Sequence, residues 1–185
     1  MRTARLIMRK ETARRVLAVD PLSRGVGFAV LEGQDNLIDW GIKTTEKADN
    51  AKSARVIDKL IDRFRPDVLV LEDWDSAGSR RCGRVETLLD RIAAKEGRRV
   101  HVRLVTKREI RSIGPLPLTG TKHGRASFLA ERFPELQAFL PPFRKTWMPE
   151  DDRMAIFDAL SFAVASVRTS KKIAPLALPA PDGSI

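Results

Sequence analysis

The sequence contains a single cysteine, Cys82, among its 185 residues. One cysteine excludes an internal disulfide and a cysteine-rich metal site, and it fits a reducing compartment, so we expect a cytoplasmic protein. No apolar run approaches the roughly 18 residues that a membrane-spanning helix needs. The first residues, MRTARLIMRKETARR, also lack the apolar stretch of a secretory signal. This length and composition predict one ordinary globular domain.

Acidic residues are fewer than basic ones, 24 against 34, which gives a net charge of +10. A small basic protein most often binds a polyanion, and nucleic acid is the commonest one. The excess of basic residues lies in two segments. Residues 1–15 carry six basic residues and one acidic residue, and residues 80–111 carry eleven basic and four acidic residues. Residues 16–79 carry eight basic and twelve acidic residues. Basic segments beside an acidic one suit a site for phosphates and metal cations, although each segment alone also fits a solvated surface.

Apolar runs, some of them alternating with polar residues, predict five strands, at 15–20, 25–31, 37–43, 67–72 and 100–105. The first three are joined by short turns and should form an antiparallel meander. The fourth is almost entirely apolar, so we expect it in the middle of a sheet that is covered on both faces.

Apolar residues at helical spacing predict the helices. Asn50 is a candidate cap for a helix that should end before Pro66, and Thr106 with Glu109 forms a capping box for a short helix. The other predicted helices are a basic amphipathic one at 79–97, one near 121–133 and a last one at about 150–168.

The order βββ-α-β-α-β-α-α-α predicts an α/β fold with a mixed five-stranded sheet flanked by helices. We expect a basic N-terminal arm at 1–14, one folded domain at 15–168 and a flexible C-terminal tail at 169–185, where three prolines fall.

Three carboxylates lie in otherwise apolar elements: Asp20 and Glu72 end the first and fourth strands, and Asp158 is inside the last helix. A buried element rarely carries an ionised group unless that group is paired or binds a metal. Carboxylates without His or Cys suit Mg²⁺ or Mn²⁺, and two such ions about 4 Å apart promote phosphodiester hydrolysis. Taken singly, each acid also fits a turn, a cap or an ion pair, such as Asp158 with Arg153 or Lys172.

Asp151 and Asp152 are further candidates for a metal ligand. In a helix that begins at Glu150, Asp151 and Asp158 share a face but lie about 10.5 Å apart along the axis. The same acids also fit favourable charges in the first turn of a helix.

Three motifs follow one another along the chain: VLAVDPLSRGVG at 16–27, PDVLVLE at 66–72 and DALSFA at 158–163, with a weaker GTK at 120–122. Their order and spacing resemble those of the RuvC-like Holliday junction resolvases of the ribonuclease H-like superfamily. The resemblance covers about residues 15–168. It implies a ribonuclease H-like fold with metal ligands at Asp20, Glu72 and Asp158. It also implies an endonuclease, a homodimer, that hydrolyses branched DNA with Mg²⁺, for which Mn²⁺ substitutes.

Three positions depart from the family pattern. Leu22 follows Asp-Pro where the family has Gly, so this turn must avoid a positive φ there or change its shape. Ala155 stands where the family often has a second acid. Asp75 stands where the family often has an aromatic residue that stacks in the junction, with Trp74 next to it.

Basic and aromatic side chains near the acids are the predicted contacts to DNA. The start of the basic helix follows Glu72 directly, and arginine binds phosphate through two donors. Trp74 is a candidate for stacking on a base, and a core or interface position is its alternative. The predicted nucleic-acid-binding residues are Arg80, Arg81, Arg84, Lys107, Lys122 and Trp74.

Other functions fit parts of the sequence. A non-catalytic nucleic-acid-binding protein with the same fold accounts for Leu22 and Ala155. The first motif also resembles the phosphate-binding turn of actin-like ATPases, but those proteins need a second domain. The two histidines are His101, which we expect to be structural, and His123, a candidate for proton transfer.

Overall fold

The computed structural model describes residues 13–45, 49–75, 83–96, 100–145 and 147–170. The predicted arm and tail lie outside these ranges except for their innermost two residues each. Their extents therefore stay predictions.

Five strands form one mixed sheet in the order β3-β2-β1-β4-β5. The first three are antiparallel neighbours, and β4 pairs in parallel with both β1 and β5. The strands are β1 (Arg15–Leu22), β2 (Gly25–Glu32), β3 (Asn36–Thr44), β4 (Val68–Glu72) and β5 (His101–Val105). The predicted fold class is therefore confirmed, including the position of the fourth strand inside the sheet.

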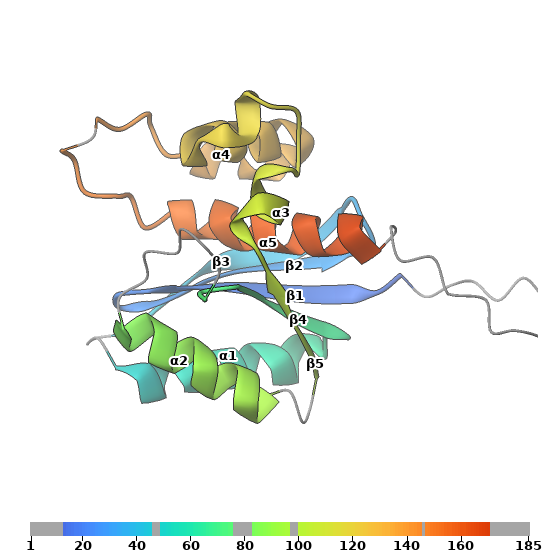
Figure 1. Ribbon diagram of the computed structural model, residues 1–185, viewed down its shortest axis with the longest axis vertical. Helices are drawn as coiled ribbons and strands as arrows, with labels where there is room; N and C mark the ends of the chain where they lie inside the picture. Colours follow the sequence, from blue (N-terminus) through green and yellow to red (C-terminus); the bar gives the residue numbers. More distant parts are fainter. Residues whose placement is uncertain (1–12, 46–48, 76–82, 97–99, 146, 171–185) are drawn as a thin grey trace, which may run out of the picture.

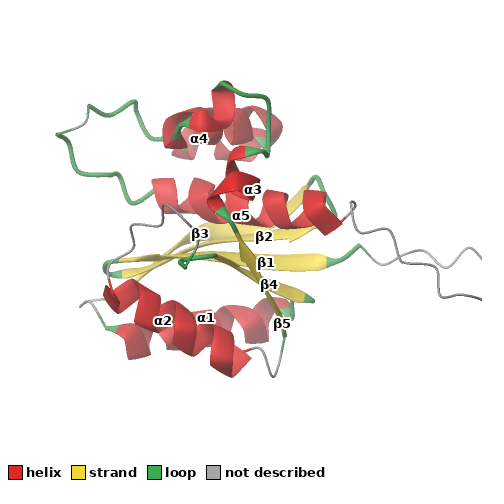
Figure 2. Ribbon diagram, in the orientation of Figure 1, coloured by secondary structure: helices red, strands yellow, loops and turns green. Residues whose placement is uncertain are grey.

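Helices cover both faces of this sheet (Figures 1 and 2). One face carries α1 (Asn50–Phe64) and α2 (Gly83–Glu96), and the other carries α5 (Met154–Ser170). The helix α4 (Lys122–Arg132) packs on the outer side of α5. The short elements are α3 (Lys107–Arg111) and the 3₁₀ turns η1 (Leu118–Gly120) and η2 (Pro134–Phe139). Within the described ranges, no helix has the length and apolar character needed to cross a membrane.

Side chains of β1 and β4 alternate between two buried clusters. Leu17 and Val19 join the cluster under α1 and α2, whereas Val16 and Ala18 join the cluster under α5. Because successive strand residues point to opposite faces, Asp20 follows Ala18 onto the α5 face. The same alternation places Glu72 on that face after Val70.

The turn after β1 accommodates Leu22 without a left-handed backbone. β1 continues to Leu22, which pairs with Gly25 across the turn, and the positive φ of 135° falls on Gly25. Among the described residues, Arg65 is the only non-glycine with a positive φ. Leu22 therefore lies in a region open to any side chain, as the sequence required.

The start of α5 differs from the prediction, because the helix begins at Met154 rather than at Glu150. The Asp151 carboxylate accepts a hydrogen bond from the backbone N–H of Arg153 at 2.9 Å, in a turn just before the helix. The same carboxylate pairs with the Arg153 guanidinium at 2.6 Å. The helix ends at Ser170, two residues beyond the predicted end. At the start of α1 the cap is Asp49 rather than Asn50.

The helix α5 approaches β2 very closely at Gly27, which is paired with Asp20. A Cβ atom on Gly27 would lie 2.5 Å from the Cβ of Ala155 and 2.7 Å from its carbonyl oxygen. Only small residues allow this approach. Ala155 is therefore a packing position between the helix and the sheet.

Candidate functional site

Asp20 and Glu72 lie at the same end of adjacent parallel strands. The pairing sets Ala18 of β1 opposite Val70 of β4, and both acids are two residues further along. Both are buried, with exposed fractions of 3% and 7%. The sheet therefore brings the first two predicted ligands to neighbouring positions beneath α5.

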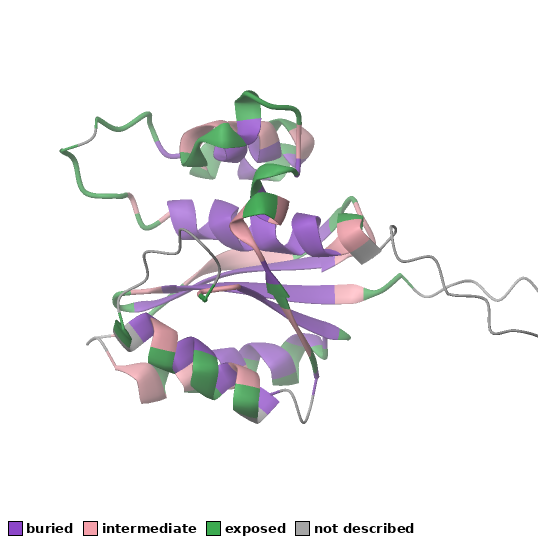
Figure 3. Ribbon diagram, in the orientation of Figure 1, coloured by how far each residue is buried: buried purple, intermediate pink, exposed green. Residues whose placement is uncertain are grey.

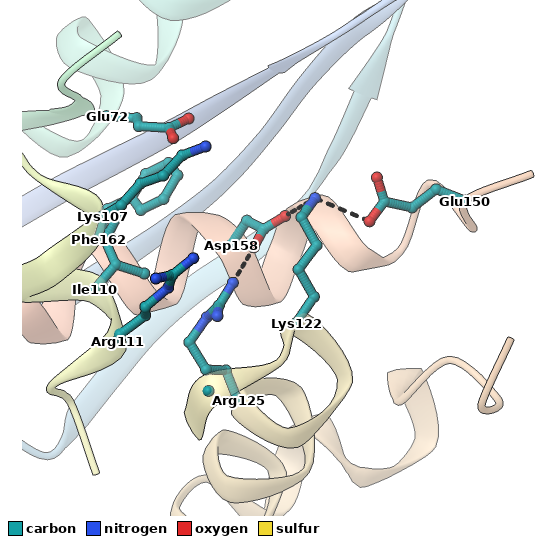
Figure 4. Close-up of a pocket in the computed structure, with 10 residues that line it drawn as sticks. Glu72, Lys107, Ile110, Arg111, Lys122, Arg125, Glu150, Asp158 and Phe162 are labelled. Carbon is teal, nitrogen blue, oxygen red and sulfur yellow. Dashed lines mark hydrogen bonds and ion pairs between the residues drawn. The ribbon is translucent and has the colours of Figure 1, made fainter. Parts of the chain in front are cut away.

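Asp158, the third predicted ligand, lies on α5 and is 7% exposed. It shares with Glu72 a pocket of about 400 Å³ between the sheet edge, α3, α4 and α5 (Figure 4). The sequence motifs therefore placed two of the three acids in one pocket, and Asp20 is not among the side chains that line it. The lining residues are Glu72, Lys107, Ile110, Arg111, Gly120, Lys122, Arg125, Glu150, Asp158 and Phe162.

Cations from α4 hold the Asp158 carboxylate. The Lys122 amine lies 2.9 Å from Asp158 Oδ2 and 2.9 Å from Glu150 Oε1, so it bridges the two acids. The Arg125 guanidinium lies 3.7 Å from Asp158 Oδ1, and it also donates to the Thr119 carbonyl oxygen at 3.3 Å. Asp158 is thus paired with Lys122 and Arg125, and not with Arg153, which pairs with Asp151.

Burial and charge act in opposite directions on these cations. Burial disfavours the charged form of Lys122, but the Asp158 and Glu150 carboxylates outweigh it and raise the pKa of this amine. Burial lowers the pKa of Arg125, and the nearby Arg111 guanidinium adds to this effect, while Asp158 opposes it. Lys122 is half exposed, whereas the Arg125 side chain is 10% exposed. Lys122 is therefore the more accessible member of the pair, although both line the pocket.

The opposite wall of the pocket comes from α3, which carries Lys107 and Arg111. The predicted capping box orients this helix: the Thr106 hydroxyl accepts from the Glu109 N–H, and the Glu109 carboxylate accepts from the Thr106 N–H at 2.8 Å. Glu109 also pairs with Arg103 of β5 at 3.2 Å. In Figure 4 the Lys107 and Glu72 side chains extend toward the same side of the pocket.

Three charged residues of the site were not singled out from the sequence as site residues: Arg111, Arg125 and Glu150. Arg125 lies three positions after Lys122 on α4, and residues at this spacing share a helix face, so the spacing was an available signal. Glu150 was read only as a charge in the first turn of a helix. It lines the pocket instead, whereas Asp151 and Asp152 do not.

Trp74 and His123 are not among the residues that line the pocket. Trp74 is half-buried and packs against the apolar cluster under α1 and α2. The His123 Nε2–H donates to the Pro141 carbonyl oxygen at 3.1 Å. Arg80, Arg81 and the side chain of Arg84 are not within the described part of the structure, so their roles stay predictions.

Comparisons with known proteins agree with this architecture. No protein-family model and no curated protein sequence matches the chain. Among solved structures, Thermus thermophilus RuvC is similar, with a TM-score of 0.57 and 16% identity over 85% of this chain and 96% of that one. RuvC from the same organism in complex with a Holliday junction substrate gives a TM-score of 0.59 and 15% identity, over 86% of this chain and 96% of that one. The yeast mitochondrial Holliday junction resolvase Ydc2 gives a TM-score of 0.52 and 15% identity, over 88% of this chain and 82% of that one.

These similarities confirm the fold that the sequence motifs indicated. The chain has the fold of RuvC-type Holliday junction resolvases, over nearly the full length of the two RuvC chains. At this level of identity the likeness concerns the fold, and the activity has to be argued from the pocket.

Proposed function

We propose that this protein is a metal-dependent endonuclease that hydrolyses phosphodiester bonds in branched DNA. One observation carries the proposal: Glu72 and Asp158, from separate elements, meet in a pocket that also holds Lys107, Arg111, Lys122 and Arg125. Carboxylates and cations around one small pocket suit a reaction on a phosphate group. The fold similarity to junction resolvases supports DNA as the substrate.

The donor set fits Mg²⁺ in kind, because Glu72, Asp158 and Glu150 offer hard oxygen ligands at the pocket and Asp20 lies one strand away. Among the described residues, no three His, Cys, Asp or Glu side chains lie close enough together to bind one ion. Lys122 and Arg125 balance the charge of Asp158 instead. We propose Asp20, Glu72 and Asp158 as the ligands, a role that requires the Lys122 amine to leave Asp158 and the three carboxylates to move closer together. A bound pair of Mg²⁺ or Mn²⁺ ions would activate the attacking water and stabilise the leaving 3′ oxygen.

The cations of the pocket have a separate task, which is to hold and orient the phosphate. Arg111 and Arg125 supply planar groups that match two phosphate oxygens at once, and Lys107 and Lys122 supply point charges. Lys122 is half exposed, so its amine can reach a phosphate at the mouth of the pocket. Contacts of this type position the backbone without reading its sequence.

A non-catalytic DNA-binding protein is the second candidate function. It is favoured by the pairing of Asp158 with two cations and by the use of position 155 for packing against Gly27. Both candidates bind DNA, so they differ only in cleavage and in metal binding.

A cleavage assay on a synthetic four-way junction separates the two functions. We expect the wild type to nick the junction in Mg²⁺ and not in EDTA, and Asp20→Asn, Glu72→Gln and Asp158→Asn to fall to background. Asp90→Asn, on the exposed side of α2, is the matched control and should cut at the wild-type rate. Equal background from wild type and Asp20→Asn would exclude the nuclease.

Metal binding gives a readout that does not depend on cleavage. Calorimetric titration of Mn²⁺ should give heat with the wild type and little with Asp158→Asn, while both proteins still bind DNA in EDTA. DNA binding without metal binding or cleavage would establish the second function. We also propose a homodimer, since one cut on each of two strands needs two sites, and sedimentation measures this directly.

A further inference from the structure

Residues 141–149, in the connection between η2 and α5, expose large apolar side chains to solvent. Phe143 is 79% exposed and Trp147 is 77% exposed, and Met148 is also exposed. Figure 3 shows most of this segment in the colour of exposed residues, extending away from the helices. Neighbouring large apolar residues left in water commonly mark a binding surface.

The two charges within residues 141–149 are both positive, whereas Glu150, Asp151 and Asp152 follow directly. The sequence at 141–149 is PPFRKTWMP, which contains Arg144 and Lys145 and no acid. The Lys145 amine lies over the Trp147 ring, 5.2 Å from its centroid. Arg144 donates to the Met148 carbonyl oxygen, which closes the segment into a turn. Aromatic rings interleaved with cations are typical of surfaces that bind single-stranded nucleic acid.

Contacts with the first turn of α4 anchor the segment at both ends. His123 donates to the Pro141 carbonyl oxygen and meets the Phe143 ring edge-on, with 5.4 Å between ring centroids. At the other end Glu150 pairs with Lys122. Because Lys122 and Glu150 also line the pocket, both ends of the segment lie next to the proposed site of cleavage.

We infer that Phe143 and Trp147 stack on unpaired DNA bases next to the scissile phosphate, while Arg144 and Lys145 contact the neighbouring backbone. The inference rests on the proposed function, and it assigns to this segment the recognition of bases that have left the duplex. The positive charge of the segment favours a nucleic acid over an apolar protein partner or a second copy of the chain.

Anisotropy measurements in EDTA test this inference without any need for cleavage. The probes are a perfect duplex, the same duplex with a three-base bulge, and a four-way junction. Trp147→Ala should lose about tenfold in affinity for the bulged DNA and the junction, and less than about twofold for the duplex. Trp147→Phe should restore most of the loss, because it keeps a stacking ring. Ile38→Ala on β3, which is also exposed, is the matched control and should behave as wild type.

A 2-aminopurine base placed in the bulge reports on stacking directly, since its fluorescence falls when a ring stacks on it. The wild type should quench it and Trp147→Ala should not. Equal losses on all three DNAs, or none, would overturn the inference. So would sedimentation in which Trp147→Ala dissociates a self-assembled complex while DNA binding is unchanged.

The outcomes separate this inference from the proposed function. A wild type that discriminates bulged from duplex DNA through Trp147 but never cuts would refute the nuclease and leave the stacking surface standing. A wild type that cuts junctions while Trp147→Ala binds every probe normally would refute the stacking surface alone.

Discussion

Replacing Asp158 by asparagine should destabilise the metal-free protein, and this outcome is not the usual one for a metal site. Unpaired carboxylates that await a cation repel one another, so removing one of them commonly stabilises the fold. Here the Asp158 side chain is 9% exposed and is already paired with Lys122 at 2.9 Å and Arg125 at 3.7 Å. The asparagine keeps the shape of the side chain and removes its charge.

The expected magnitude follows from the burial of the partners. Breaking a buried charge pair by removing one partner costs about 3 to 5 kcal/mol, mainly because the other charge stays buried and uncompensated. Arg125 meets this condition, but Lys122 is half exposed and solvent screens its charge. We therefore expect a loss of about 2 to 3 kcal/mol in the free energy of unfolding. For a protein of this size, that lowers Tm by roughly 4 to 12 °C.

Thermal and urea unfolding in EDTA measure this loss. The matched control is Asp90→Asn on the exposed side of α2, which should change the unfolding free energy by less than about 0.5 kcal/mol. The double variant Asp158→Asn/Arg125→Met should lose less than the sum of its single changes, because the two side chains interact. An Asp158→Asn protein that is as stable as wild type, or more stable, would refute the pairing of Asp158 with these cations.

Three further predictions concern other parts of the molecule. Burial raises the pKa of Glu109, but hydrogen bonds from Thr106 and Arg103 outweigh it, so its folded pKa lies below the ordinary 4.5. The ionised Glu109 carboxylate therefore contributes its full stabilisation above pH 4.5, and this stabilisation is lost as the pH falls through the lower pKa of the folded state. Urea unfolding should show that Glu109→Gln lowers the free energy of unfolding by about 1 kcal/mol at pH 7 but by little at pH 2. Gly27→Ala should lower the free energy of unfolding by about 1 to 3 kcal/mol or prevent folding, since its Cβ would meet Ala155. Gly83→Ala is the control and should be neutral, because a Cβ there would meet no other atom. Equal urea midpoints for the two variants would contradict the close approach of α5 to β2. If the four pocket cations contact phosphates, DNA affinity should fall about a hundredfold between 50 and 200 mM salt, and anisotropy that shows a flat response would exclude them as phosphate contacts.

Much of the fold could be predicted because hydrophobic periodicity reports local burial. The run LAV before Asp20 and the run VLVL before Glu72 marked two buried strands, and their order relative to the predicted helices defined the α/β class. The same pattern identified Asp158 as an acidic residue in an otherwise apolar helix. These are local properties, because each depends on residues a few positions apart.

The composition of the pocket depended on the tertiary structure. Lys122 and Glu150 are 28 residues apart, and no periodicity indicates that they share a salt bridge. Because α5 starts at Met154, Asp151 lies in the turn before the helix and pairs with Arg153, while Glu150 lines the pocket. The contact of Gly27 with Ala155 likewise exists only where β2 and α5 meet.

The sequence by itself therefore determined where the strands and helices lie and which acids have apolar neighbours, because the spacing of apolar residues reflects local burial. Tertiary structure decided which cation neutralises Asp158, which acid reaches the pocket and which aromatic segment lies beside it. The physical reason is that ion pairs and close packing depend on distances between elements remote in sequence, and folding alone sets those distances.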